Sequence, residues 1–127
     1  MIFDTDVMIW AERGNEHAIE MISDASMRAI SIYTFMELIQ GARNAKELRV
    51  IKEFIYEGHF QIFPLTENIG HRALIYVEEY GPGHGLRAAD AIIAATATEN
   101  TRMLVSGNHK HYRAIKELKF KHFKATL

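Results

Sequence analysis

The sequence predicts an α/β fold in which a short, mainly parallel central sheet carries helices on both faces. Strand-like and helix-like patterns alternate along the chain, and strands separated by helices are joined by right-handed crossovers that make neighbouring strands parallel. The length of 127 residues, with 48% hydrophobic and 24% charged residues, is typical of one compact domain with a substantial core. We therefore expect residues 1–127 to form a single domain.

The first ten residues begin this fold. An apolar strand starts almost at Met1 and ends at Asp4, so a carboxylate arrives at the end of the strand that we expect at the centre of the sheet. Asp before an apolar run is also a favoured helix N-cap, because its oxygen accepts a backbone N–H that would otherwise be unpaired. Asp4 or Asp6 can thus cap a short helix through Trp10, which Gly14 ends.

Hydrophobic periodicity and capping residues predict the remaining elements in order. A helix from Asn15 to Ile22 is followed by strand 28–33, helix 34–43, helix 45–57, strand 60–63, helix 66–80, helix 86–99, strand 102–105, helix 111–118 and a weak edge strand over 122–125. Thr34 and Glu37 have the spacing of a capping box, which opens its helix. The helix over 86–99 is rich in Ala and apolar nearly all round, so we expect it to be buried.

Four polar residues are predicted to meet at one edge of the sheet. Asp4 ends the first strand, Glu37 lies about one turn into the helix after the second, Asp90 lies near the start of the Ala-rich helix, and Asn108 follows strand 102–105. Strand C-terminal ends and helix N-termini share one edge of a parallel sheet, where ligands bind. Converging carboxylates raise one another's pKa unless a cation neutralises them. Oxygen ligands without His or Cys suit Mg²⁺ or Mn²⁺.

Each of these residues also has a purely structural interpretation. Glu37 can reciprocate the capping box that Thr34 opens. Asp90 can answer the helix dipole, although a carboxylate in so apolar a run would otherwise be buried without a partner, at a cost of several kcal/mol. Asn108 can form a turn with Gly107. The sequence alone leaves these alternatives open.

Four segments, in order and with matching spacing, carry a family resemblance. They are Asp4-Thr-Asp6-Val, Thr34-Phe-Met-Glu37-Leu with Gly41-Ala42, Leu86-Arg-Ala-Ala-Asp90-Ala-Ile-Ile-Ala-Ala-Thr-Ala97, and Leu104-Val-Ser-Gly-Asn108. Across essentially the whole chain, the sequence resembles PIN-domain nucleases, especially the compact VapC-type toxins of prokaryotic toxin–antitoxin pairs. The resemblance implies a three-layer α/β/α sandwich and a Mg²⁺- or Mn²⁺-dependent endoribonuclease. It also implies a homodimer held inactive by a cognate antitoxin whose tail wraps the active-site groove.

The resemblance also implies roles for individual residues. Asp4, Glu37 and Asp90 match the acidic residues of the family, and Asn108 takes the place of a fourth that is Asp or Asn, so one negative charge is missing here. By hypothesis, Asp4 and Asp90 hold the metal ion and Glu37 orients or deprotonates the attacking water. Asn108 can ligate through its carbonyl or position a water. Asp6 and Ser106 are candidate accessory groups near the same edge.

The charge of the chain is distributed unevenly. Residues 101–127 contain seven Lys or Arg and one acidic residue, whereas the first hundred residues contain eight basic and fifteen acidic ones. A basic segment can attract phosphates or simply solubilise a surface. We predict RNA phosphate contacts for Arg87, at the start of the Ala-rich helix, and for Lys110 and Arg113 beyond Asn108. An ordinary surface charge is the alternative for Arg87.

Two other functions remain open at this stage. A strand followed by Asp4-x-Asp6 and Val also begins haloacid-dehalogenase-like phosphatases, with Asp4 as nucleophile and Asp6 as acid/base. That family needs an acidic pair after a later strand, where this chain has Ser106-Gly-Asn108, and it would leave Glu37 and Asp90 unexplained. The other possibility is a non-catalytic binding module on the same fold.

Composition excludes several classes of site. The chain has no cysteine, so disulfides, thiolate metal sites and Cys nucleophiles are excluded. No stretch approaches the roughly 20 apolar residues that cross a bilayer, and the N-terminus lacks a basic segment followed by a long apolar run. We therefore expect a soluble, cytoplasmic protein that does not associate with membranes.

Overall fold

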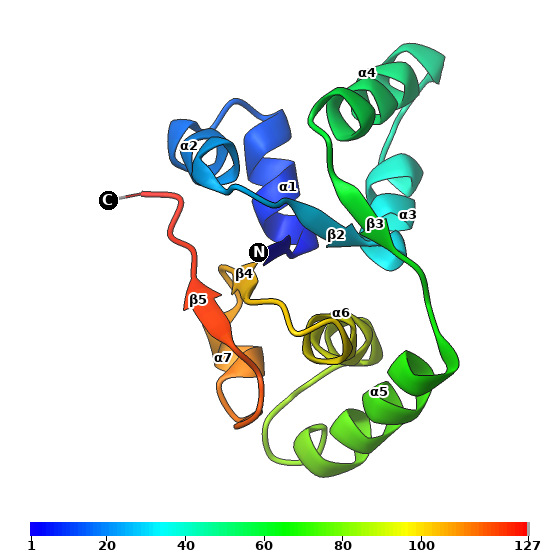
Figure 1. The fold of residues 1–127 in the computed structure, drawn as a ribbon, viewed down its shortest axis with the longest axis vertical. Coiled ribbons are helices and arrows are strands. Elements are labelled where there is room, and N and C mark those ends of the chain that lie inside the picture. The colour runs from blue at the N-terminus through cyan, green and yellow to red at the C-terminus, as the bar shows by residue number, and fades with distance from the viewer. Residues whose placement is uncertain (127) are drawn as a thin grey trace.

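The computed structural model, which describes residues 1–126, consists of a five-stranded sheet between two layers of helices (Figure 1). The strands are β1 (Ile2–Phe3), β2 (Ala29–Ser31), β3 (Gln61–Phe63), β4 (Leu104–Ser106) and β5 (Phe120–His122). The helices are α1 (Thr5–Glu12), α2 (Glu16–Asp24), α3 (Ile32–Gln40), α4 (Ala45–Glu57), α5 (Glu67–Tyr80), α6 (Ala88–Glu99) and α7 (His109–Tyr112). The first four helices cover one face and the last three the other (Figure 1). The predicted α/β/α sandwich is confirmed.

The sheet places β1 at its centre, as expected. The strand order is β3-β2-β1-β4-β5, and every pairing is parallel. From β1 the chain builds the sheet outward in one direction through β2 and β3, and then returns to build the other side with β4 and β5. The order therefore reverses between β1 and β4. In open parallel sheets the crevice at such a reversal, beyond the strand C-terminal ends, is where ligands bind.

Alternating side chains of each strand supply two separate cores. Ile2 of β1 packs toward α5 and α6, whereas Phe3 packs toward α1, α3 and α4, and both side chains are fully buried. Because successive strand residues point to opposite faces, two residues suffice to anchor β1 in both layers. The Ala-rich helix α6 is buried as predicted, with Ala91, Ala94 and Ala95 fully inaccessible to solvent.

Helix α3 begins earlier than the sequence suggested. Strand β2 ends at Ser31, whose Oγ accepts a hydrogen bond from the backbone N–H of Tyr33 at 3.1 Å and so caps the helix. Thr34 lies inside the helix and is fully buried. The predicted capping box of Thr34 and Glu37 is therefore wrong, because Ser31 is a good cap only three residues upstream. Glu37 is consequently available for another role.

The C-terminal elements also differ from expectation. The helix predicted over 111–118 is only the short α7, and the strand predicted over 122–125 is β5, shifted toward the N-terminus. Tyr112, Ile115 and Leu118 are all buried, but they reach the core through successive turns rather than a continuous helix. Their spacing of three residues fits either arrangement, so the sequence pattern could not distinguish them.

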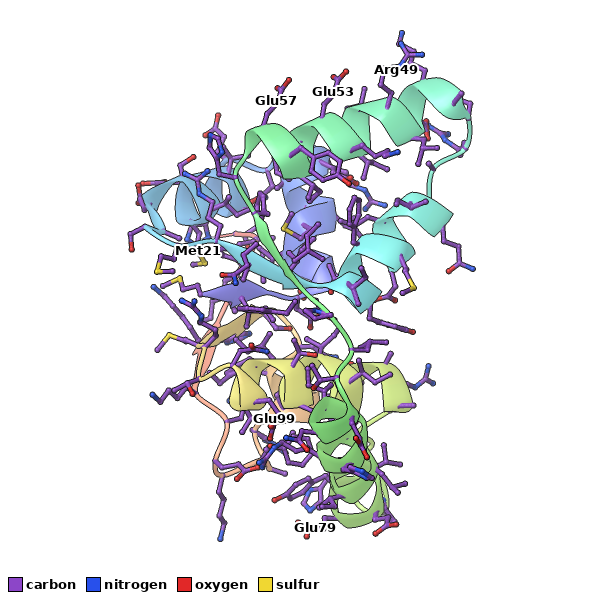
Figure 2. All side chains as sticks on the ribbon, turned by 45° about the vertical axis from the view of Figure 1, so that its right-hand side comes forward. Met21, Arg49, Glu53, Glu57, Glu79 and Glu99 are labelled. Atoms are coloured by element: carbon purple, nitrogen blue, oxygen red, sulfur yellow. The ribbon has the colours of Figure 1, made fainter. Side chains whose placement is uncertain are left out.

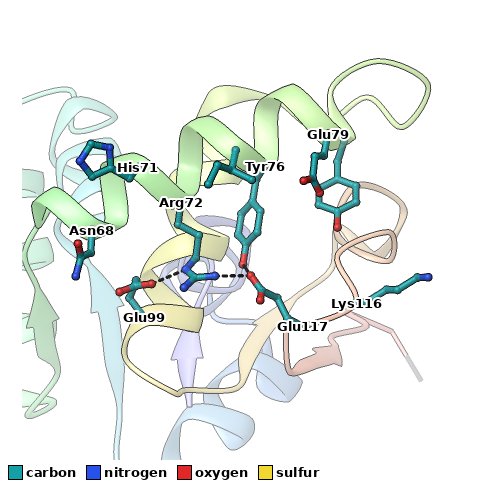
Figure 3. A pocket seen from close by; sticks show the side chains of 10 residues that line it. Asn68, His71, Arg72, Tyr76, Glu79, Glu99, Lys116 and Glu117 are labelled. Carbon is teal, nitrogen blue, oxygen red and sulfur yellow. Dashed lines mark hydrogen bonds and ion pairs between the residues drawn. The ribbon is translucent and has the colours of Figure 1, made fainter.

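A cluster of charged side chains fastens α5 to its neighbours (Figure 3). The guanidinium of Arg72 pairs with Glu99 of α6 and, at 2.6 Å, with Glu117 in the segment that follows α7. The hydroxyl of Tyr76 donates to the same Glu117 carboxylate. The hollow beside them has a volume of about 650 Å³, and Arg72, Glu99 and Glu117 in its wall pair with one another. Within residues 1–126, none of the helices has the length and apolar character needed to span a bilayer.

Candidate active site

A hollow of about 360 Å³ lies at the reversal point of the sheet, beyond the C-terminal ends of β1 and β4. Its lining residues are Asp4, Thr5, Asp6, Glu37, Ala89, Asp90, Ile93, Gly107 and Asn108. The four polar residues predicted to meet at this edge are thus brought together around one hollow, although they come from separate parts of the chain. Ser106 is fully buried directly beside it.

Asp4 is both a helix cap and a wall of the hollow. Its Oδ1 accepts a hydrogen bond from the backbone N–H of Thr5 at 2.8 Å, at the start of α1. Its Oδ2 accepts from the hydroxyls of Ser106 at 2.7 Å and Tyr112 at 3.0 Å. The residue is only 6% exposed. Burial, and then the neighbouring charge of Asp6, raises the pKa of Asp4 to about 6. The predicted cap is therefore confirmed, and the same residue lies in the hollow.

Asp6 is fixed by the backbone on both sides. Its Oδ1 accepts from the N–H of Val7 and its Oδ2 from the N–H of Gly107, each at 2.8 Å. The second bond ties α1 to the turn that follows β4. Gly107 approaches so closely that a Cβ there would lie 2.8 Å from Asp6 Oδ2. Burial raises the pKa of Asp6. With both oxygens engaged, Asp6 holds the rim together.

Asp90 lies on the side of the hollow opposite Asp4, where several hydrogen-bond contacts surround its carboxylate. It is the third residue of α6, and its Oδ2 accepts from the backbone N–H of Arg87 at 3.2 Å. The same oxygen lies 3.0 Å from His111 Nδ1, which in turn lies 2.8 Å from the side-chain amide of Asn108. Asp90 Oδ1 lies 3.5 Å from the Tyr112 hydroxyl. A structural role at the helix start and a position in the hollow are therefore combined in Asp90 as well.

The Tyr112 hydroxyl links the two sides of the hollow. It contacts Asp4 at 3.0 Å and Asp90 at 3.5 Å from a side chain that is 1% exposed. Burial and the charges of these two carboxylates raise the pKa of Tyr112 well above its ordinary value. The neutral hydroxyl therefore donates its one proton to Asp4 Oδ2, the nearer carboxylate, and Asp90 Oδ1 lies at the limit of hydrogen-bond distance on its other side.

A hydrogen bond from helix α1 holds the side chain of Glu37. The Thr5 hydroxyl donates to Glu37 Oε1 at 2.6 Å, and the same hydroxyl lies 3.1 Å from the buried Thr34 Oγ1. Glu37 lines both the hollow and a neighbouring groove of about 990 Å³ between α1, α3 and α4. Its carboxylate is therefore oriented by one hydrogen bond while it borders open space on two sides.

Sequence reasoning did not find Thr5, His111 or Tyr112. Nothing in the residue order marks Tyr112 as a partner of Asp4, because the contact spans 108 positions and depends on the turns after α7. The residue's place in a predicted helix indicated only a core side chain. Conversely, the predicted phosphate contacts Arg87, Lys110 and Arg113 are exposed and do not line the hollow. They lie on the segments that carry Asp90 and Asn108.

The donor groups of the hollow fit a hard divalent cation. Asp4, Asp90 and the Asn108 carbonyl offer oxygen, the ligand that Mg²⁺ and Mn²⁺ prefer. Burial raises the pKa of Asp4. A cation beside this carboxyl would stabilise its ionised form and so lower that pKa. Within residues 1–126, no three His, Asp or Glu side chains are grouped as a ready-made metal site. The closest arrangement is the pair of carboxylates that share Tyr112.

The family follows from comparison with known proteins. The sequence model of the PIN domain matches residues 1–117. The chain belongs to the PIN-domain family. Proteins of this family are nucleases, which favours a nuclease over the phosphatase alternative, and the fixed position of Asp6 agrees with this. A search of curated proteins found no significant match.

Solved structures share the fold of this PIN domain along nearly its whole length. A toxin–antitoxin complex from Klebsiella pneumoniae is 27% identical, with a TM-score of 0.80 over 92% of this chain and 93% of that chain. DNA-bound VapBC from Salmonella typhimurium is 23% identical, with a TM-score of 0.80 over 95% and 96% of the two chains. FitAcB from Neisseria gonorrhoeae is 22% identical, with a TM-score of 0.74 over 98% and 96%.

Proposed function

We propose that this PIN domain is a metal-dependent endoribonuclease of the VapC type, the toxin of a toxin–antitoxin pair. One observation carries the proposal: Asp4 and Asp90, which are far apart in the chain, share the Tyr112 hydroxyl at the reversal point of a parallel sheet. Glu37 and Asn108 border the same hollow. The buried Asp4, the half-buried Asp90, a third carboxylate and an amide oxygen form a donor set suited to phosphodiester hydrolysis.

The proposed reaction is attack of water on phosphorus with cleavage of a P–O bond. Asp4 and Asp90 would hold Mg²⁺ or Mn²⁺, which supplies positive charge to a phosphoryl oxygen and lowers the pKa of water. Glu37, oriented by the Thr5 hydroxyl on Oε1, keeps its other oxygen for the proton of the attacking water. Asn108 would orient water or substrate through its amide. The leaving oxygen takes up a proton from solvent, and Glu37 afterwards returns its proton to solvent. Ser106 positions Asp4, and Asp6 positions the turn that carries Asn108.

RNA is the proposed substrate. The seven basic residues of 101–127 belong to the segment that contains Asn108, and Arg87 precedes the helix that contains Asp90. Lys and Arg side chains around the hollow would contact phosphates and position the chain without reading its sequence. We assign this positioning to Arg87, Lys110 and Arg113.

The proposed partner is an antitoxin whose tail lies in the groove between α1, α3 and α4. This groove meets the hollow at Glu37, so a peptide in it would reach the candidate active site. The structure from Klebsiella pneumoniae, itself a toxin–antitoxin complex, supports the assignment. We further propose that the protein is a homodimer in the cytoplasm. Size-exclusion chromatography with light scattering tests the dimeric state directly.

The decisive test is cleavage of a panel of tRNA and rRNA fragments with Mg²⁺ or Mn²⁺, comparing the natural chain with Asp4→Asn and Asp90→Asn. We expect cleavage by the natural chain alone and none in EDTA. Each metal should also raise the melting temperature of the natural chain more than that of Asp4→Asn. Cleavage no faster than that of Asp90→Asn would refute the nuclease. Metal binding without turnover on any RNA would favour the binding module.

A further inference from the structure

Four aromatic rings form a continuous series from the candidate active site to the surface. The Tyr112 ring lies 5.7 Å from Phe120, the Phe120 ring lies 5.8 Å from His109, and the His109 ring lies 5.2 Å from His122. The interplanar angles are 35°, 39° and 28°, so the two inner ring pairs are tilted and only the outer pair, His109 and His122, is stacked. The inner end of the series is the hydroxyl that contacts Asp4 and Asp90. The outer end is a stacked pair of imidazoles.

The outer pair lies beside the hollow. His122 is the register partner of Ser106 on the neighbouring parallel strand, and Ser106 donates to Asp4. Two strand spacings, about 10 Å, therefore separate the backbone at His122 from that at Asp4. His109 follows Asn108 directly and begins α7, which lies next to β5 (Figure 1). Both histidines thus continue the row of residues at the C-terminal edge of the sheet.

The stacked imidazoles are open to solvent. Both histidines are exposed, and β5 is the edge strand of the sheet. The surrounding segment, residues 101–127, has an excess of six positive charges. A planar aromatic face in a positive field beside the cleavage centre is what an unstacked RNA base and its phosphates require. The inner rings are buried or half-buried, so the outer pair has a fixed orientation.

We propose that His109 and His122 form a stacking platform for an unpaired base of the RNA substrate, next to the bond that is cut. The proposal rests on the proposed ribonuclease function and adds a nucleotide subsite to it. Stacking on an aromatic face tolerates every base, so the platform selects single-stranded RNA rather than a sequence. A base held there would fix the adjoining phosphate relative to the carboxylates of the hollow.

The test measures equilibrium binding of a short fluorescent single-stranded RNA by anisotropy, in EDTA and in an Asp90→Asn background, so that no turnover occurs. Replacing His109 or His122 by Ala should weaken binding about tenfold. Replacing His122 by Phe, which keeps an aromatic face and loses the ring nitrogens, should restore binding to within about twofold of the parent. His71→Ala, an exposed histidine on α5, is the matched control and should change nothing.

A second comparison separates stacking from electrostatics. The same proteins are then compared on an RNA that lacks the base at the position bound by the platform. On this abasic RNA, the Ala variants and the parent protein should bind equally well. Equal losses for the Ala and Phe variants, or losses that persist on every abasic RNA, would overturn the platform. Because these assays need no cleavage, their result is independent of the turnover test. A chain that cleaves RNA but whose His109→Ala and His122→Ala variants bind normally would retain its function and lose the platform.

Discussion

At the scale of residues, the candidate site combines groups that serve structure and chemistry together. Asp4 caps α1 and lines the hollow, and Asp90 accepts a bond at the start of α6 and faces Tyr112. For such residues a structural interpretation and a functional interpretation are compatible, so one does not exclude the other. The sequence predicted Asp4, Glu37, Asp90 and Asn108, because strand ends and helix starts meet at one edge. It could not predict Tyr112, whose position depends on long-range packing.

Replacing Asp4 by Asn is expected to stabilise the metal-free protein near neutral pH. The pKa of Asp4 in the folded protein is about 6, above its ordinary value of 3.8, so folding favours the protonated form. The ionised carboxylate therefore costs about 3 kcal/mol of stability above pH 6, and this cost declines as the pH falls and vanishes below the ordinary pKa. Urea denaturation in EDTA at pH 8 should show a gain of about 1–3 kcal/mol for Asp4→Asn. A gain that persists at pH 3.5 would contradict this cause.

Replacing Gly107 by Ala should disturb the rim without touching a proposed metal ligand. The new Cβ would lie 2.8 Å from Asp6 Oδ2, so the bond between that carboxylate and the Gly107 N–H must lengthen or break. We expect a loss of about 1–3 kcal/mol in the free energy of unfolding, measured by urea denaturation. Gly70→Ala is the control: nothing lies within 4 Å of its Cβ in helix α5, so it should be neutral or stabilising. Equal changes in the free energy of unfolding for Gly107→Ala and Gly70→Ala would show that the contact between Gly107 and Asp6 does not contribute to stability.

At the scale of elements, the helices and strands were predicted in the right order, and α4 has the predicted bounds 45–57, but several other ends differ. Ser31 caps α3 in place of Thr34, and the spacing of Tyr112, Ile115 and Leu118 is satisfied by turns. Periodicity reports which side chains face the core, and both a helix and a series of turns can bury the same side chains. The boundary of α3 mattered for function, because it removed the capping explanation of Glu37.

The cluster around Arg72 gives a prediction at this scale. Replacing Arg72 by Met should lower the free energy of unfolding by about 1 kcal/mol, because Glu99 and Glu117 lose their common partner and solvent screens only part of the loss. The cluster joins three segments, α5, α6 and the turns after α7 (Figure 3). Arg43→Met, which breaks an exposed pair between a residue just before α4 and Glu47 four positions later, should have a much smaller effect. Chemical denaturation at low and high salt would measure both, and a larger loss for Arg43→Met would refute the assignment.

At the scale of the whole molecule, the layers, the parallel pairing and the central position of β1 were all predictable. They follow from the alternation of strands and helices and from the right-handed rule for crossovers. The strand order was not predicted beyond β1. The uneven charge was visible in the sequence, and the structure adds that its basic part contains β4, α7 and β5, together with Gly107 and Asn108, which line the hollow.

The charge distribution predicts how RNA affinity depends on salt. In EDTA, the logarithm of the association constant should fall with the logarithm of salt concentration by about 0.7 for each phosphate contact. The double variant Lys110→Gln/Arg113→Gln removes two such contacts, so it should make this slope shallower by about 1.4 and weaken binding to all sequences alike. Arg49→Gln/Lys52→Gln removes the same charge from α4, where Arg49 points away from the body of the molecule (Figure 2), and should leave the slope unchanged. If both double variants changed the slope equally, RNA would be attracted by the net charge of the protein alone.

The central position of β1 has a consequence for the timing of synthesis. Asp4 leaves the ribosome first, but Ser106 and Tyr112, which hold its carboxylate, lie 102 and 108 positions later. At typical translation rates they follow after about 5–20 s. The strand that begins the chain therefore waits unpaired on the β4 side until nearly all of the sheet has been made. A nascent chain therefore carries no assembled candidate site, and under the proposed function it would be inert during translation and competent only at the end, when an antitoxin already present could bind it.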